Sequence, residues 1–245
     1  MSNEGDGSDK ARDHQARLPQ LALSLIASLA QISIMIRRLI QLFTGLTLYG
    51  LAIALIVRAD LGLDPWDVLN QGVFERFAAP VGISFGLVVN LIGLAILLLW
   101  IPLRQMPGLG TVANVLVIGT IANIGLRWIP ADLPLVFRGG LLLSGIVLTG
   151  VASGAYIGAG LGPGPRDGLM TGIVRITGWP VKWVRTAIEI AVVAVGWMLG
   201  GSIGLGTILY ALSIGPLVHV FLPMFSISKP DMPPPLVAPA HSPPV

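Results

Sequence analysis

Six long apolar segments, separated by short polar or glycine- and proline-rich connections, dominate the chain. They cover residues 39–57, 82–101, 111–129, 139–157, 181–199 and 205–223. Each is close to the length of about 20 residues that an α-helix needs to cross the hydrocarbon core of a bilayer. The pattern therefore predicts an all-α polytopic membrane protein.

Two shorter and more polar segments follow the first and fourth apolar segments. They run from Pro65 to about Ala79 and from Pro165 to Trp179. Their length corresponds to roughly 21 Å of helix, less than the roughly 30 Å bilayer core. Proline suits the first position of a helix, and Gly62 and Gly162 shortly before it favour a break in the chain. We expect short broken helices, re-entrant or interfacial, that begin at these prolines.

The two short segments belong to a longer internal repeat. Residues 60–72, DLGLDPWDVLNQG, resemble residues 160–172, GLGPGPRDGLMTG, and further on residues 108–111 match residues 204–207. The offset of 100 in the first match shortens to 96 in the second through a trimmed loop. We therefore predict two tandem homologous repeats, residues 36–130 and 137–224, each with three spanning helices and one short helix.

Two topologies are open for such repeats. If the short helices do not cross, three crossings per repeat invert the second copy relative to the first. If they cross, the protein has eight spans and parallel repeats, an arrangement that the distribution of Arg and Lys mildly favours. We favour six crossings, because several ionisable groups in so short a span cost more than a few misplaced arginines.

The two ends of the chain differ in composition from the repeats. Residues 1–35 begin with a polar stretch and have no counterpart in the second repeat, so we expect a disordered or interfacial extension, with Met1 or Met35 as alternative starts. Residues 225–245 are proline-rich, and we expect a disordered tail.

Composition narrows the possible functions. Apolar residues make up 54% of the chain, charged residues 11%, and the mean hydropathy is +0.83. The net charge of +3 rests mainly on Arg and Lys at the ends of segments, where positive charge sets membrane orientation, so we expect no nucleic acid partner. The chain has no cysteine and only three scattered histidines, which give no metal or cofactor constellation. The G-x-S-x-G pattern around Ser84 opens a membrane helix without a catalytic partner, so we expect no enzyme.

A resemblance to a known family rests on residues 39–73 followed by Gly82-Ile83-Ser84-Phe85-Gly86. Its most specific part is the signature Leu61-Gly62-x-x-Pro65-Trp66-Asp67. This region resembles the YczE family of bacterial membrane proteins, relatives of the YitT group, over roughly residues 36–224. The second copy departs from the signature with Arg166 in place of the tryptophan. The resemblance implies a multi-pass protein of the bacterial cytoplasmic membrane and supplies no substrate.

The two short helices carry the main candidate site residues. Asp67 and Asp167 each lie two residues after the starting proline, in the first turn. These carboxylates either complement the helix dipole or line a polar pocket for an ion, a proton or a small solute. Arg166 with Asp167, and Arg58 with Asp60, are candidate neutralising pairs. Asn70 and Gln71 on the first short helix complete this set of binding candidates.

Glu189 is a further candidate, because it lies near the middle of an apolar span. A buried ionised carboxylate needs a partner, a proton or water. Arg185, one turn earlier, offers a local ion pair.

Duplicated units with broken helices are typical of secondary transporters. The sequence therefore favours a small-solute or ion transporter in the lipid bilayer. The alternative is a non-transporting membrane scaffold or accessory protein that acts through protein partners.

Overall fold

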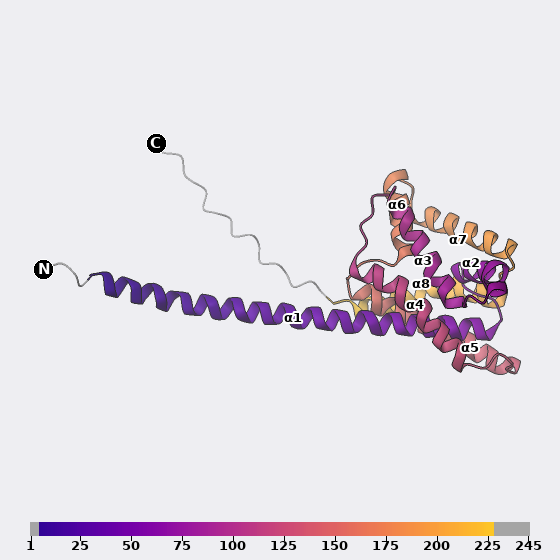
Figure 1. Ribbon diagram of the computed structural model, residues 1–245, viewed down its shortest axis with the longest axis horizontal. Helices are drawn as coiled ribbons and strands as arrows, with labels where there is room; N and C mark the ends of the chain where they lie inside the picture. Colours follow the sequence, from indigo (N-terminus) through magenta and orange to yellow (C-terminus); the bar gives the residue numbers. More distant parts are fainter. Residues whose placement is uncertain (1–4, 228–245) are drawn as a thin grey trace.

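The computed structural model describes residues 5–227, and all regular elements within them are helical (Figure 1). The long helices are α1 (Gly5–Ala59), α3 (Phe85–Trp100), α4 (Leu109–Trp128), α5 (Leu135–Gly158), α7 (Val181–Met198) and α8 (Leu205–Phe225). The two short ones are α2 (Pro65–Val73), extended by the single turns η1 (Phe74–Ala78) and η2 (Ala79–Val81), and α6 (Pro165–Thr177). The all-α prediction is confirmed for these residues, whereas most of the expected 225–245 tail lies outside them.

Among residues 5–227, four helices are long and apolar enough to cross a membrane. They comprise residues Ser28–Ala59 of α1, together with α4, α5 and α8. Of the other two expected spans, α3 is apolar but has only 16 residues. Helix α7 has 18 residues and contains Lys182, Arg185 and Glu189, which lower its hydropathy. The chain is thus a polytopic membrane protein.

Helix α1 continues well beyond the expected first span. It is unbroken from Gly5 to Ala59, so no change of structure marks the expected boundary at residue 35. Its amino-terminal half projects away from the helix bundle (Figure 1). Ala, Leu, Arg and Gln, which favour helix, are frequent in this region and give a local reason for the continuation.

The centre of the bundle is the antiparallel pair α1 and α5. A Cβ atom placed on Gly45 would lie 2.7 Å from the backbone N of Tyr156, and one on Gly145 would lie 2.6 Å from Cγ1 of Ile56. Such glycines let two helices approach closely. Because Gly45 faces the end of α5 and Gly145 faces the end of α1, the two contacts are reciprocal.

The last helix of each half packs in parallel against the first. Gly50 and Gly125 on α1 and α4 allow α4 to lie along α1, since a Cβ on Gly50 would meet Ile118 O at 2.6 Å. Gly150 and Gly154 of α5 likewise face Leu217 and Phe221 of α8. Helix α3 runs antiparallel along α4, so each helix in the series α3, α4, α1, α5 and α8 packs against the next.

The connections before α2 and α6 are anchored across the molecule. Gly206 N, at the start of α8, donates a hydrogen bond to Leu61 O at 2.7 Å, and Gly110 N, at the start of α4, donates to Leu161 O at 2.8 Å. The next residue in each connection is a glycine with positive φ, 108° at Gly62 and 126° at Gly162. This left-handed conformation is easily adopted only by glycine. Both connections thereby turn sharply and deliver α2 and α6 to the centre of the bundle.

Candidate functional site

The amino termini of α2 and α6 meet at the centre of the protein, but they are capped differently. The Oδ1 atom of Asp64 accepts hydrogen bonds from Trp66 N at 2.9 Å and Asp67 N at 3.1 Å, so Asp64 is the side-chain N-cap of α2. Helix α6 has Gly164 at the equivalent place and no side-chain cap. Pro65 and Pro165 occupy the first turns, as predicted.

Arg166 joins the two short helices. Its guanidinium lies 3.7 Å from Oδ1 of Asp64 and 3.8 Å from Oδ1 of Asp67, and its Cζ lies 5.1 Å from the centre of the Trp66 ring. The predicted pairing of Arg166 with Asp167 is therefore wrong. The side chain points instead across the gap to the carboxylates and aromatic ring at the start of α2.

The second predicted neutralising pair is also wrong. Asp60 pairs with Arg138 of α5 at 2.9 Å, and Arg138 also donates to the Ala59 carbonyl at 2.7 Å. Arg58 donates instead to the Leu126 carbonyl of α4. Arg138 is the partner of Asp60 because it lies near the start of α5. The antiparallel packing of α1 and α5 places that end of α5 beside the end of α1.

Asp67 and Asn70 are almost fully buried, with exposed fractions of 0% and 1%. Asn70 Nδ2 donates to Oδ1 of Asp67 at 2.7 Å. Oδ2 of Asp67 and Oδ1 of Asn70 are buried without a hydrogen-bond partner. The charged neighbours of Asp67 are Asp64, at the N-cap of the same helix, and Arg166. The start of α2 thus holds two acceptor oxygens that lack a donor.

Asp167 lies on the opposite side of the centre and contacts α5. The Tyr156 hydroxyl donates to Oδ2 of Asp167 at 2.9 Å, and Tyr49 packs edge-on against Tyr156 with ring centres 6.0 Å apart. Gly164 leaves room for this hydrogen bond, because a Cβ there would lie 3.1 Å from the tyrosine oxygen. The start of α6 is further fixed by Trp100, whose Nε1 donates to Pro165 O at 3.1 Å.

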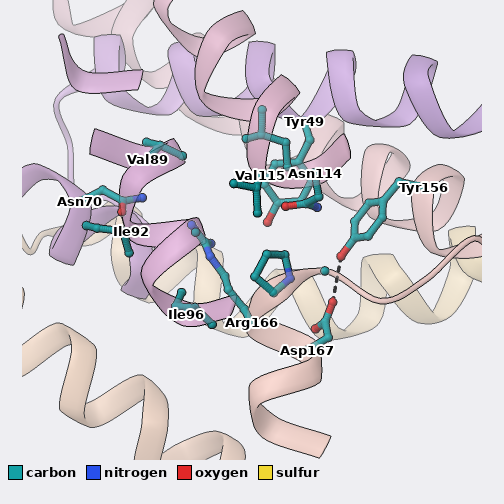
Figure 2. Close-up of a pocket in the computed structure, with 14 residues that line it drawn as sticks. Tyr49, Asn70, Val89, Ile92, Ile96, Asn114, Val115, Tyr156, Arg166 and Asp167 are labelled. Atoms are coloured by element: carbon teal, nitrogen blue, oxygen red, sulfur yellow. Dashed lines mark hydrogen bonds between the residues drawn. The ribbon is translucent and has the colours of Figure 1, made fainter. Parts of the chain in front are cut away.

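Two cavities adjoin this centre on opposite sides. The smaller, of about 80 Å³, is lined by Asn70 and by residues of α3 and α4 that include Val89, Ile92, Ile96 and Asn114 (Figure 2). The larger, of about 230 Å³, is lined by Asp64 and Trp66 and by residues of α7 and α8 that include Arg185, Glu189, Tyr210 and Gly215. Tyr49, Tyr156, Arg166 and Asp167 line both. These four side chains, which we call the dividing wall, separate the two cavities.

The remaining predicted site residues differ in position. Glu189 faces the larger cavity and accepts a hydrogen bond from Arg185 at 2.9 Å, which is the local ion pair expected from the sequence. Gln71 lies outside both cavities, and its Oε1 accepts from Ser202 N at 2.7 Å. Gln71 therefore holds the connection between α7 and α8. Among the named candidates, the structure gathers Asp67, Asn70, Arg166 and Asp167 at the centre.

Sequence reasoning missed Asp64 and assigned Tyr49 and Trp66 no role. Asp64 carried a usable signal, since an aspartate directly before a proline at a helix start is a typical N-cap. The tyrosines of the dividing wall carried none, because a single tyrosine within an apolar span is as readily explained by ordinary helix packing.

Comparison with known proteins identifies the family. The model of a family of unknown function, DUF6198, matches residues 36–223. The chain is 39% identical over 181 residues to an uncharacterized protein of Haemophilus influenzae, covering 74% of this chain and 81% of that protein. It is 33% identical over 184 residues to the uncharacterized membrane protein YczE of Bacillus subtilis, covering 74% and 83%.

A third relative, the uncharacterized protein YyaS of Bacillus subtilis, is 26% identical over 190 residues, covering 74% of this chain and 90% of YyaS. No solved structure matches the chain. The family model spans α2, α6 and the dividing wall, and the chain belongs to the YczE-like DUF6198 family of membrane proteins.

Proposed function

We propose that the protein is a small-solute or ion transporter of the bacterial cytoplasmic membrane, and not an enzyme. Its binding site would be the centre where α2 and α6 meet, and its scaffold would be two inverted repeats, residues 36–130 and 137–224. The observation that carries the proposal is the Arg166 bridge, an ionic contact between a partly buried arginine of one short helix and two buried carboxylates of the other, in the wall between two cavities. Buried charged groups in membrane proteins typically mark ion or solute pathways.

Reciprocal contacts support the repeat interpretation. Gly45 of α1 faces Ala152 and Tyr156 of α5, while Gly145 of α5 faces Ala52 and Ile56 of α1. The backbone hydrogen bonds are reciprocal as well. The start of α8 donates to the connection before α2, and the start of α4 donates to the connection before α6. A pseudo-twofold axis between two copies of one unit accounts for such pairs, and the antiparallel course of α1 and α5 makes the copies inverted.

The position of α2 supports six crossings. Arg58, at the end of α1, contacts Leu126 of α4, and Gly86, at the start of α3, donates its N–H to Asn123 Oδ1 of α4 at 2.8 Å. The end of α1 and the start of α3 therefore adjoin the same end of α4. The chain between them enters the protein and returns to the same face, as a re-entrant helix does.

Helix α6 follows an equivalent course on the other face. Leu161, after α5, contacts Gly110 at the start of α4, and Arg175, near the end of α6, donates to the Arg104 carbonyl just before α4 at 3.0 Å. Both ends of α6 thus lie on one side. Irregular backbone inside a membrane is tolerated where protein covers it or a watery cavity adjoins it, which suits a central site.

A difference between the two halves supports alternating access. Gly119 of α4 is tightly packed against α3, since a Cβ there would lie 2.1 Å from Gly86 O. Gly215 occupies the position equivalent to Gly119 in the second repeat. No atom lies within 4 Å of its Cβ position, and it lines the larger cavity. The α3–α4 pair is thus closed while the α7–α8 pair is parted. In a second state we expect the two pairs to exchange these arrangements.

Flux through the purified protein tests this proposal. Proteoliposomes would be challenged with gradients of Na⁺, K⁺, NH₄⁺, chloride, phosphate and acetate, with solid-supported membrane currents and radiotracer uptake as readouts. We expect at least one probe to give a protein-dependent signal that Asp167→Asn strongly reduces, while Asp60→Asn, at an exposed ion pair, leaves it unchanged. Absence of flux for every probe, or flux equal in Asp167→Asn and wild type, would overturn the assignment of this centre.

A further inference from the structure

We propose that Asp64 and Asp67 together form a binding site for one exchangeable proton. As a coupling site, this inference rests on the proposed transport function; as a protonation site, it stands on the geometry alone. The two carboxyl groups come from one turn, the N-cap and first turn of α2, and their residues are 3% and 0% exposed.

The charges at this point do not balance without a proton. Arg166 is the cation that faces both carboxylates, at 3.7 and 3.8 Å from their Oδ1 atoms. Two ionised carboxylates beside one guanidinium leave a buried excess negative charge, which is costly away from water. Two carboxyl groups that share a site typically keep one proton between them for this reason. One proton makes the group of three neutral.

The hydrogen-bond pattern points the same way. Oδ1 of Asp67 is satisfied by the Asn70 amide, but Oδ2 of Asp67 and Oδ1 of Asn70 are buried acceptors without donors. Leaving a buried acceptor unpaired costs about 1–3 kcal/mol. A proton on the carboxyl pair forms one O–H bond and supplies a donor where the structure has only acceptors.

The other charged and titratable groups around the centre do not remove this imbalance. Asp167 on α6 adds a further carboxylate, held by the Tyr156 hydroxyl of α5. On α7, Arg185 is engaged by Glu189 at 2.9 Å and so compensates that carboxylate. Tyr49 of α1 and Tyr210 of α8, the remaining titratable side chains at the larger cavity, carry no charge as phenols. The extra proton is therefore needed at the α2 carboxyl pair.

Both sides of the dividing wall give access to the pair. Asp64 lines the larger cavity, and Asn70, the partner of Asp67, lines the smaller one. A proton can enter through one cavity in one state and leave through the other after the helix pairs exchange. Protonation also weakens the attraction of the pair for Arg166, whose guanidinium borders both cavities. Proton binding is thus coupled to the contact that joins the two halves.

Infrared difference spectroscopy of the purified protein in lipid tests the site without any substrate or gradient. We expect the carbonyl stretch of a protonated carboxylic acid at neutral pH, fading as the pH is raised well above the ordinary carboxyl range. The band should be absent in Asp67→Asn and retained in Asp60→Asn, which alters the exposed carboxylate paired with Arg138, outside both cavities. In Asp64→Asn the remaining Asp67 pairs with Arg166 alone, so the band should again be lost at neutral pH.

Three results would overturn the inference. The first is that wild-type protein shows no such band at neutral pH, and the second is that the band persists in Asp67→Asn. The third is that adding Na⁺ at fixed pH removes the band, which would make the site one for a metal cation. Circular dichroism and size-exclusion profiles equal to wild type ensure that each variant is folded. Because the measurement needs no flux, loss of the band and loss of transport are separate outcomes, and either can fail while the other holds.

Discussion

Arg166 of α6 and Asp67 of α2 approach within 3.8 Å, although they are 99 positions apart in the sequence and belong to opposite halves of the chain. The short helices that carry them reach the centre because Gly62 and Gly162 turn the preceding connections inward. The contact therefore couples the positions of the two halves. A transporter needs such a link between its binding site and its moving elements.

Replacing Arg166 by Gln should destabilise the protein, and a second substitution should restore stability. Loss of the guanidinium leaves Asp64 and Asp67 without their cation, at a cost of about 3 kcal/mol. Adding Asp67→Asn removes one of the two buried carboxyl groups, so that Asp64 is the one acid left there without its cation. We expect Arg166→Gln to lower the thermal midpoint in detergent and the double variant to recover most of the loss. Equal midpoints for the single and double variants would contradict a direct coupling between the two side chains.

Gly164→Ala should disturb the Asp167 side of the centre. The added methyl group would lie 3.1 Å from the Tyr156 oxygen and 3.2 Å from Oδ2 of Asp167, so their hydrogen bond must lengthen or break. A hydrogen bond to a charged group contributes about 2 kcal/mol. We expect a lower thermal midpoint and a shifted Tyr156 ultraviolet absorption.

Gly139→Ala provides the matched control for this substitution. Gly139 lies in α5, and its Cβ position has no neighbour within 4 Å. Alanine favours helix by about 1 kcal/mol over glycine, so this variant should be unchanged or slightly more stable. If both substitutions lowered the thermal midpoint equally, crowding around Gly164 would not be the cause of the lost stability.

The re-entrant course of α2 and α6 can be tested with single cysteines, since the native chain has none. Ala79 follows α2 and Gly178 follows α6, and both positions are exposed. With inverted repeats, Ala79→Cys and Gly178→Cys should react with a membrane-impermeant thiol reagent from opposite sides of the membrane. Labelling of both from the same side would instead require parallel repeats and eight crossings.

The sequence predicted the helical elements and the breaks at Pro65 and Pro165 because these depend on local patterns: apolar length, proline position and glycine conformation. It did not predict the ionic partners. Arg166 precedes Asp167 in the chain, yet its partners are Asp64 and Asp67, and Asp60 pairs with Arg138 and not with the nearby Arg58. These contacts depend on how the two halves pack. Nearness in sequence was a poor guide, since adjacent residues on a helix point in different directions.

If the closed α3–α4 pair and the parted α7–α8 pair exchange their arrangements, cysteines placed at equivalent positions of α4 and α8 should differ in reactivity. Val218 of α8 lines the larger cavity, whereas Ala122, 96 positions earlier on α4, is 0% exposed in the core. In the state described here, Val218→Cys should react with a water-soluble thiol reagent and Ala122→Cys should not. If the protein alternates, Ala122→Cys should become reactive when Val218→Cys becomes protected, for example after the proton gradient across proteoliposomes is reversed. Constant protection of Ala122→Cys under all gradients, with Val218→Cys always reactive, would mean that the asymmetry is fixed and would argue against alternating access.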